Sequence, residues 1–140
     1  MFLDDQDYKV MIGDKAIDII QQSSVDNRKR AEKMAIEEVS GYLRSRYNTE
    51  AVFSATGDER NDLVVMYTCD VALYHMVSWL PNRMGYEIRE IRYKRAIEWL
   101  ESAQSGKVMP GLPTPIGENG EEDAYNPVRF GSLPPNRYTW

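Results

Sequence analysis

Proline spacing constrains this chain more than any other feature of its sequence. Six of the seven prolines and four of the nine glycines lie beyond Gly106. Because proline has no backbone N–H and its ring collides with the preceding turn, no helix can run through that spacing. The sequence therefore predicts a body over residues 1–107 and an extended arm over residues 108–140.

The body is long enough for one domain with its own core. Hydrophobic spacing and cap residues predict helices over about 5–12, 14–22, 25–43, 62–80 and 83–105, with N-caps at Asp4 or Asp5, Ser23 or Ser24, and Asn61 or Asp62. Turn formers in residues 48–61 predict a loop there, with room for a brief strand at 51–53. The expected fold is an all-α, up-and-down bundle of four to five helices with a long irregular, proline-rich C-terminal arm.

Apolar spacing also indicates which helix faces turn inward. The segment 62–80 is apolar on nearly every side, interrupted mainly by Asp70 and His75, so we expect it to be the central helix. In the helix over 25–43 the expected inward residues are Ala31, Met34, Ala35, Val39, Tyr42 and Leu43. In the last helix they are Ile88, Ile91, Ala96, Trp99, Leu100 and Ala103, with Gly106 as the C-cap.

The arm contains apolar anchors that free linkers lack. A tail of this composition is usually disordered on its own. Six side chains favour docking on the body, a sister subunit or another protein instead: Tyr125, Val128, Phe130, Leu133, Tyr138 and Trp140. We predict that these residues bind a partner.

The sequence lacks the motifs of catalytic and metal sites. It has no glycine-rich phosphate loop, no paired Cys and His spacing and no Gly-x-Ser-x-Gly turn. Cys69 and the single histidine, His75, stand six residues apart, about 600° around a helix, so they point away from one another. We expect no enzyme, no cofactor and no metal, with Cys69 a small buried side chain and His75 a core or interface residue. A small enzyme that uses His75 or Asp70 is the weakest alternative.

Asp70 needs a partner because a carboxylate in so apolar a helix is costly to bury alone. Arg46, Arg92 and Arg95 are the candidates for this core or subunit-interface pairing, and the sequence does not choose among them.

Net charge argues against a general nucleic-acid or membrane binder. The formal charge is −5, and the basic clusters at 28–33 and 89–95 are interleaved with glutamates that dilute the field needed for phosphate binding. No signal peptide or membrane span is apparent, and one cysteine fits a reducing, intracellular origin. A small helical DNA-binding or regulatory protein stays open as the alternative function.

Four segments in a fixed order resemble a known family. They are YLRSRY at 42–47, CDVALY at 69–74, RYKRAIEWL at 92–100 and the Gly106-Lys107 end of the last helix. Together they resemble the small helical head-tail connector proteins of tailed phages, and the Mu-like prophage group most closely, over residues 1–110. The arm is longer and richer in proline than is usual in the short members of that family.

This resemblance implies a structural role in the virion. Such proteins form a cyclic, usually twelve-fold ring of sister subunits beneath the portal protein. The ring extends the DNA channel, with DNA as passing cargo, and offers a platform to a downstream stopper or tail protein. The implied location is the head-tail interface of the virion, reached from the host cytoplasm during assembly, and the C-terminal segment is expected to pack on the portal.

Overall fold

Every regular element in the described part of the chain is helical, so the expected all-α class is confirmed. The computed structural model describes residues 2–13, 18, 25–79 and 85–115. Within these residues the elements are α1 (Asp5–Ile12), α3 (Val25–Leu43), α4 (Thr49–Ser54), the 3-10 helix η2 (Gly57–Glu59), α5 (Asp62–Ser78) and α6 (Tyr86–Ser105). None of the helices seen there is long and apolar enough to cross a membrane.

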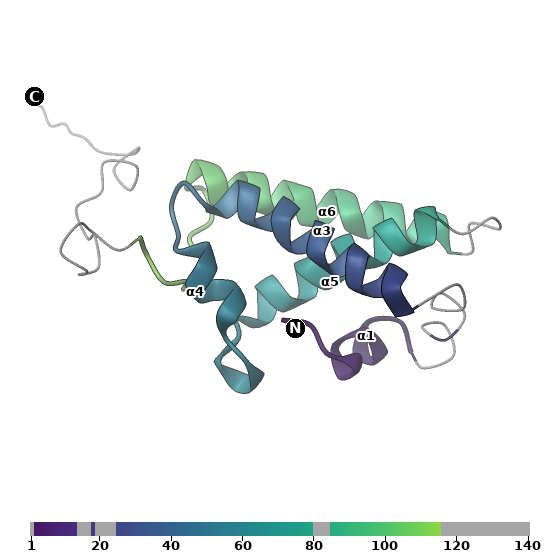
Figure 1. Ribbon diagram of the computed structural model, residues 1–140. Coiled ribbons are helices and arrows are strands. Elements are labelled where there is room, and N and C mark those ends of the chain that lie inside the picture. The colour runs from purple at the N-terminus through teal and green to yellow at the C-terminus, as the bar shows by residue number, and fades with distance from the viewer. Residues whose placement is uncertain (1, 14–17, 19–24, 80–84, 116–140) are drawn as a thin grey trace, which may run out of the picture.

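Helix α5 is the centre of the bundle, as its all-round apolar sequence predicts. It packs most extensively against α3 and α6 and also carries α1 on another side (Figure 1). Its fully buried side chains include Val64, Val71, Leu73 and Val77. Because the middle of α5, residues 69–73, is buried on every side, no polar stripe is needed there.

Local caps fix the ends of the helices where the sequence indicates them. Asp4 and Asp7 form a reciprocal capping box at the start of α1, with N–O distances of 3.0 and 2.8 Å. Asn61 Oδ1 accepts hydrogen bonds from the first free N–H groups of α5. Gly106 ends α6 at φ 86°, in the left-handed region. The expected helix over 14–22, apart from Asp18, and the Ser23 or Ser24 cap lie outside the described residues.

The expected loop over 48–61 is wrong in part, because the segment contains α4 and η2. Asn48 Oδ1 accepts a hydrogen bond from Ala51 N at 3.2 Å and so caps α4. Val52 is buried, and Phe53 packs edge-on against Phe2 with ring centroids 4.8 Å apart. The segment 48–61 therefore contains two short helices, and residues 51–53 belong to α4 rather than to a strand.

Three residues expected to face the core are exposed instead: Met34 at 45%, Ile88 at 60% and Ile91 at 67%. Helix α3 buries a narrower stripe than its apolar pattern suggested, because its buried apolar residues follow one another every four positions. In the N-terminal half of α6 the inner face is occupied by Arg92 and Tyr93, which leaves both isoleucines on the outside. The other expected inward residues are buried or partly buried.

Candidate interaction surfaces

A partly buried ion pair joins α5 and α6. Asp70 on α5 is 2% exposed, and Arg92 on α6 holds it through both carboxylate oxygens, at 2.7 Å from Nε and 3.3 Å from Nη2. Burial raises the pKa of Asp70 above its ordinary value, and the hydrogen bond from Arg92 opposes that shift. Arg92 is therefore the partner that the sequence left open.

The other two candidate partners of Asp70 lie elsewhere. Arg46, in the turn after α3, donates from Nε to the carbonyl of Gln104 at 2.8 Å. It thereby provides a hydrogen-bond donor to one of the last carbonyl groups of α6. Arg95 is exposed and makes no ion pair with a described residue. Its charge still acts on Asp70, where it lowers the carboxyl pKa.

His75 has the hydrogen-bond partner expected of a core or interface histidine. Its Nε2 lies 3.2 Å from Glu38 Oε1, and Tyr93 donates its hydroxyl to Glu38 Oε2 at 2.7 Å. Tyr93 also stacks on Tyr74, with ring centroids 4.2 Å apart. These contacts tie α3, α5 and α6 together, and the hydrogen bond from His75 is the main influence that lowers the pKa of Glu38.

Cys69 is fully buried, and burial raises the pKa of its thiol. A neutral thiol in this position is a poor nucleophile. In the described part of the chain no group of three His, Cys, Asp or Glu side chains is placed to hold a metal ion.

The N-terminal segment is attached to the bundle by a network of polar side chains. The sequence pattern gives little indication of this network. Tyr8 donates to Glu32 Oε1 at 2.8 Å, and Arg28 also binds Glu32, at 3.0 Å from Nε. Arg60 donates to the carbonyl of Phe2 at 2.7 Å and to Asp7 Oδ2 at 2.6 Å. Glu32 could have been noticed, because it falls four residues after Arg28 on the buried side of α3.

The first residues of the arm are hydrogen-bonded to the helical body and pack against it. Asn48 donates its backbone N–H to the carbonyl of Pro113 at 2.8 Å, and Val108 donates to the carbonyl of Ser102 at 3.2 Å. Leu112 packs against the core. The six predicted anchors lie beyond this root, outside the described residues: Tyr125, Val128, Phe130, Leu133, Tyr138 and Trp140.

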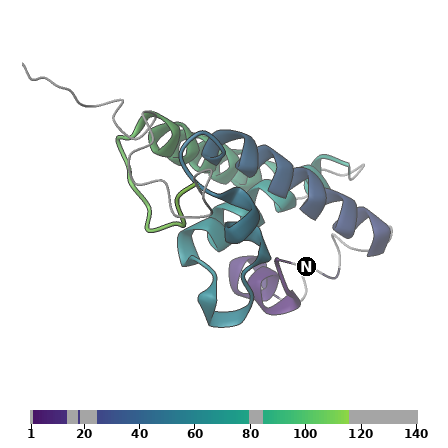
Figure 2. The same ribbon diagram turned by 60° about the vertical axis from the view of Figure 1, so that its left-hand side comes forward.

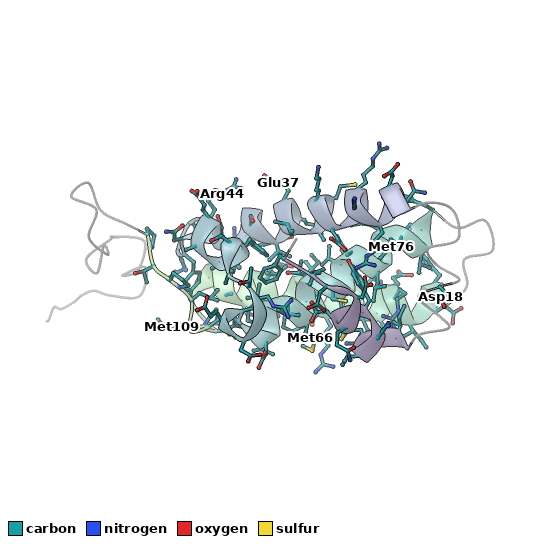
Figure 3. The ribbon with its side chains drawn as sticks, turned by 60° about the horizontal axis from the view of Figure 1, so that its bottom comes forward. Asp18, Glu37, Arg44, Met66, Met76 and Met109 are labelled. Atoms are coloured by element: carbon teal, nitrogen blue, oxygen red, sulfur yellow. The ribbon has the colours of Figure 1, made fainter. Side chains whose placement is uncertain are left out.

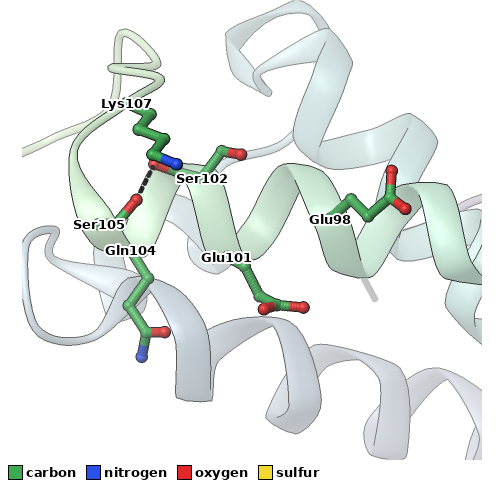
Figure 4. Close-up of a pocket in the computed structure, with 6 residues that line it drawn as sticks. All are labelled: Glu98, Glu101, Ser102, Gln104, Ser105 and Lys107. Atoms are coloured by element: carbon green, nitrogen blue, oxygen red, sulfur yellow. Dashed lines mark hydrogen bonds between the residues drawn. The ribbon is translucent and has the colours of Figure 1, made fainter.

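A hollow of about 460 Å³ follows the C-terminal end of α6 (Figure 4). Its lining comes from α6 and the turn after it: Glu98, Glu101, Ser102, Gln104, Ser105 and Lys107. A hollow along a single helix has no opposing wall, so it does not enclose a small molecule as ligand sites do. This hollow is therefore a poor candidate for a ligand site.

One comparison with known proteins identifies a family. A family model described as "Bacteriophage Mu, Gp36" matches residues 4–126, which include all the described helices and the first part of the arm. No curated protein and no solved structure matches the chain.

Proposed function

The chain belongs to the bacteriophage Mu Gp36 family, and on that premise we propose that this phage protein is a structural head-to-tail adaptor of the virion. In this proposal sister subunits form a closed ring, of twelve copies by resemblance, beneath the portal protein. The ring extends the DNA channel and presents a platform to a stopper or tail protein.

The family match is the observation that carries the proposal, and the fold is compatible with it. Closed rings require heterologous contacts, in which two different surfaces of each subunit meet. A bundle of helices packed around a central helix has distinct outer faces available for such contacts. Exposed Ile88 and Ile91 supply apolar surface for one of them.

A non-enzymatic role is supported by how the reactive side chains are used. His75 is bound to Glu38, Asp70 is held by Arg92, and Cys69 is buried. Each of these groups lies between helices, and none borders the hollow in Figure 4.

DNA is best regarded as cargo rather than as a bound ligand. The net charge of −5 repels phosphate, so DNA would slide past a ring of these subunits without adhering. Arg28 and Arg92, one from each basic cluster, are engaged by Glu32 and Asp70. These pairs weaken the alternative of a DNA-binding regulator.

The arm is the proposed portal-binding element. Residues in the segment 108–115 contact the body, so a deletion that preserves these contacts starts at residue 116. We expect the variant lacking 116–140 to keep its helical circular dichroism signal and to lose attachment to the portal protein of the same phage.

Electron microscopy of the full-length chain mixed with that portal tests the whole proposal. A closed ring seated on the portal is the expected image. Monomers that ignore the portal, combined with retention on DNA that weakens steeply with salt, would favour the regulator instead.

A further inference from the structure

The N-terminal half of α6 exposes two aliphatic side chains beside three arginines, of which Arg95 is exposed, Arg92 is bound to Asp70 and Arg89 is partly buried. Ile88 and Ile91 are the exposed apolar residues. Arg89, Arg92 and Arg95 follow one another at intervals of three, and all three act on the single carboxylate of Asp70. We call these five residues of α6 the α6 patch.

In the described part of the protein, Asp70 is the one carboxylate that pairs with a guanidinium of the α6 patch. Asp70 hydrogen-bonds Arg92 alone, while Arg89 Nη1 is buried without a hydrogen-bond acceptor in the part of the protein that the structure describes. Arg95 is exposed to solvent. Three guanidinium groups around one carboxylate attract a further acidic group, and the adjacent isoleucines favour an apolar contact beside it.

A surface of opposite charge lies on the other side of the bundle. Asp58 and Glu59 on η2 and Asp62 at the start of α5 are exposed, next to Leu63, which is 44% exposed. Arg60 stands among them, but its guanidinium is engaged by the N-terminal segment through a carboxylate and a carbonyl. We call Asp58, Glu59, Asp62 and Leu63 the acidic edge.

The two surfaces face away from each other within one subunit. Figures 1 and 2 both place α6 along one side of the bundle and η2 at the opposite side. The α6 patch lies toward the end where α6 begins, whereas the acidic edge lies near α4. A contact between them on neighbouring copies is heterologous and repeats from copy to copy, as a ring requires.

We infer that the α6 patch of one copy binds the acidic edge of the next copy. In this contact Leu63 covers the two isoleucines, and the carboxylates of the acidic edge meet the exposed guanidinium of Arg95. The inference rests on the proposed ring and names the surfaces that build it. Because the two surfaces are displaced along the bundle, the helices stand inclined to the plane of the ring.

Cysteine crosslinking tests the contact directly. Cys69 is the only cysteine and is buried, so introduced surface thiols are the ones that react. At millimolar protein with a bismaleimide, the double variant Ile91→Cys/Leu63→Cys should give a ladder of dimers, trimers and longer species. Each single variant should remain monomeric on the denaturing gel.

Every other crosslinking pattern rejects the contact. Dimers from Ile91→Cys alone would mean that two α6 patches face one another. No adduct from the double variant would mean that the surfaces do not meet. The matched control Glu37→Cys/Leu63→Cys uses an exposed α3 residue outside both surfaces and should give no ladder (Figure 3).

Charge exchange provides an independent test by sedimentation and electron microscopy. Arg95→Glu and Asp62→Arg should each abolish self-association when pure. Mixed in equal amounts they should assemble again, because the two introduced charges attract one another and the unchanged Arg95 of one variant meets the unchanged Asp62 of the other. The matched changes Arg44→Glu and Glu37→Arg, outside both surfaces, should leave assembly intact.

The failures of the two proposals are distinguishable. Rings on the portal that are insensitive to both charge changes and give no ladder would overturn the inferred contact and leave the adaptor function standing. A ladder from a chain that never closes into rings would support the contact and overturn the ring.

Discussion

The guanidinium of Arg46 lies over Gly106, within 3.1 to 3.3 Å of the position that a β-carbon would occupy there. This glycine also adopts φ 86°, which other L residues rarely adopt. Arg46 can therefore pack against the end of α6 because residue 106 has no side chain.

Gly106→Ala should destabilise the protein, by about 1–2 kcal/mol from the left-handed backbone alone. Gly41→Ala is the matched control, because Gly41 lies inside α3 with open space around its added β-carbon. That change should stabilise by about 0.5–1 kcal/mol. Urea unfolding of both variants measures the free energies, and equal signs would contradict the backbone strain expected for a side chain at position 106.

Arg92→Ala should lower the free energy of unfolding by about 3 kcal/mol, because it leaves a buried carboxylate without its partner. Arg95→Ala, an exposed change on the same helix, should stay within about 0.5 kcal/mol of the wild type. Urea unfolding of the two variants in parallel makes the comparison. Similar small losses in both would mean that Asp70 is satisfied by another group.

Trp99→Ala should cost about 3 kcal/mol, at the lower end for large aromatic residues because Trp99 is only partly buried. Trp99 stacks on Tyr67 with ring centroids 4.8 Å apart. Trp79→Ala is the control, since that side chain is 43% exposed. Thermal unfolding compares the two, and an unchanged melting temperature for Trp99→Ala would assign this residue to an intermolecular contact.

Glu38→Gln should make the free energy of unfolding fall less steeply as the pH is lowered into the acid range. The pKa of Glu38 is lowered from 4.5 in the folded protein, mainly by the hydrogen bond from His75. Its ionised form therefore contributes stability that is fully present above 4.5 and is lost as the pH falls through the folded pKa. Unfolding measured at neutral pH and in acid, below the ordinary pKa of a glutamate, checks this. Parallel curves for both proteins would exclude Glu38 as a source of the acid sensitivity.

Local signals in the sequence predicted the helices best where a cap and a long apolar pattern coincided. Asp4, Asn61 and Gly106 begin or end helices as their side chains and backbone freedom dictate. Helix α4 was missed because six residues are too few to display a helical period. Its packing depends on Phe2, a distant residue that contacts Phe53.

The candidate surfaces were harder to predict because they depend on packing between helices. Apolar spacing marks a stripe on α6, but it does not say which half of that stripe a neighbour covers. Ile88 and Ile91 were therefore expected in the core and are exposed. The choice of Arg92 over Arg46 for Asp70 likewise required the position of α6 against α5.

The hydrogen bond from Asn48 to Pro113 uses only main-chain atoms, so it places few demands on side-chain identity at the root of the arm. The path of the chain at residue 113 is thereby set by the fold of the body. The same carbonyl would be offered by any residue at position 113, so the body holds the start of the arm through its backbone.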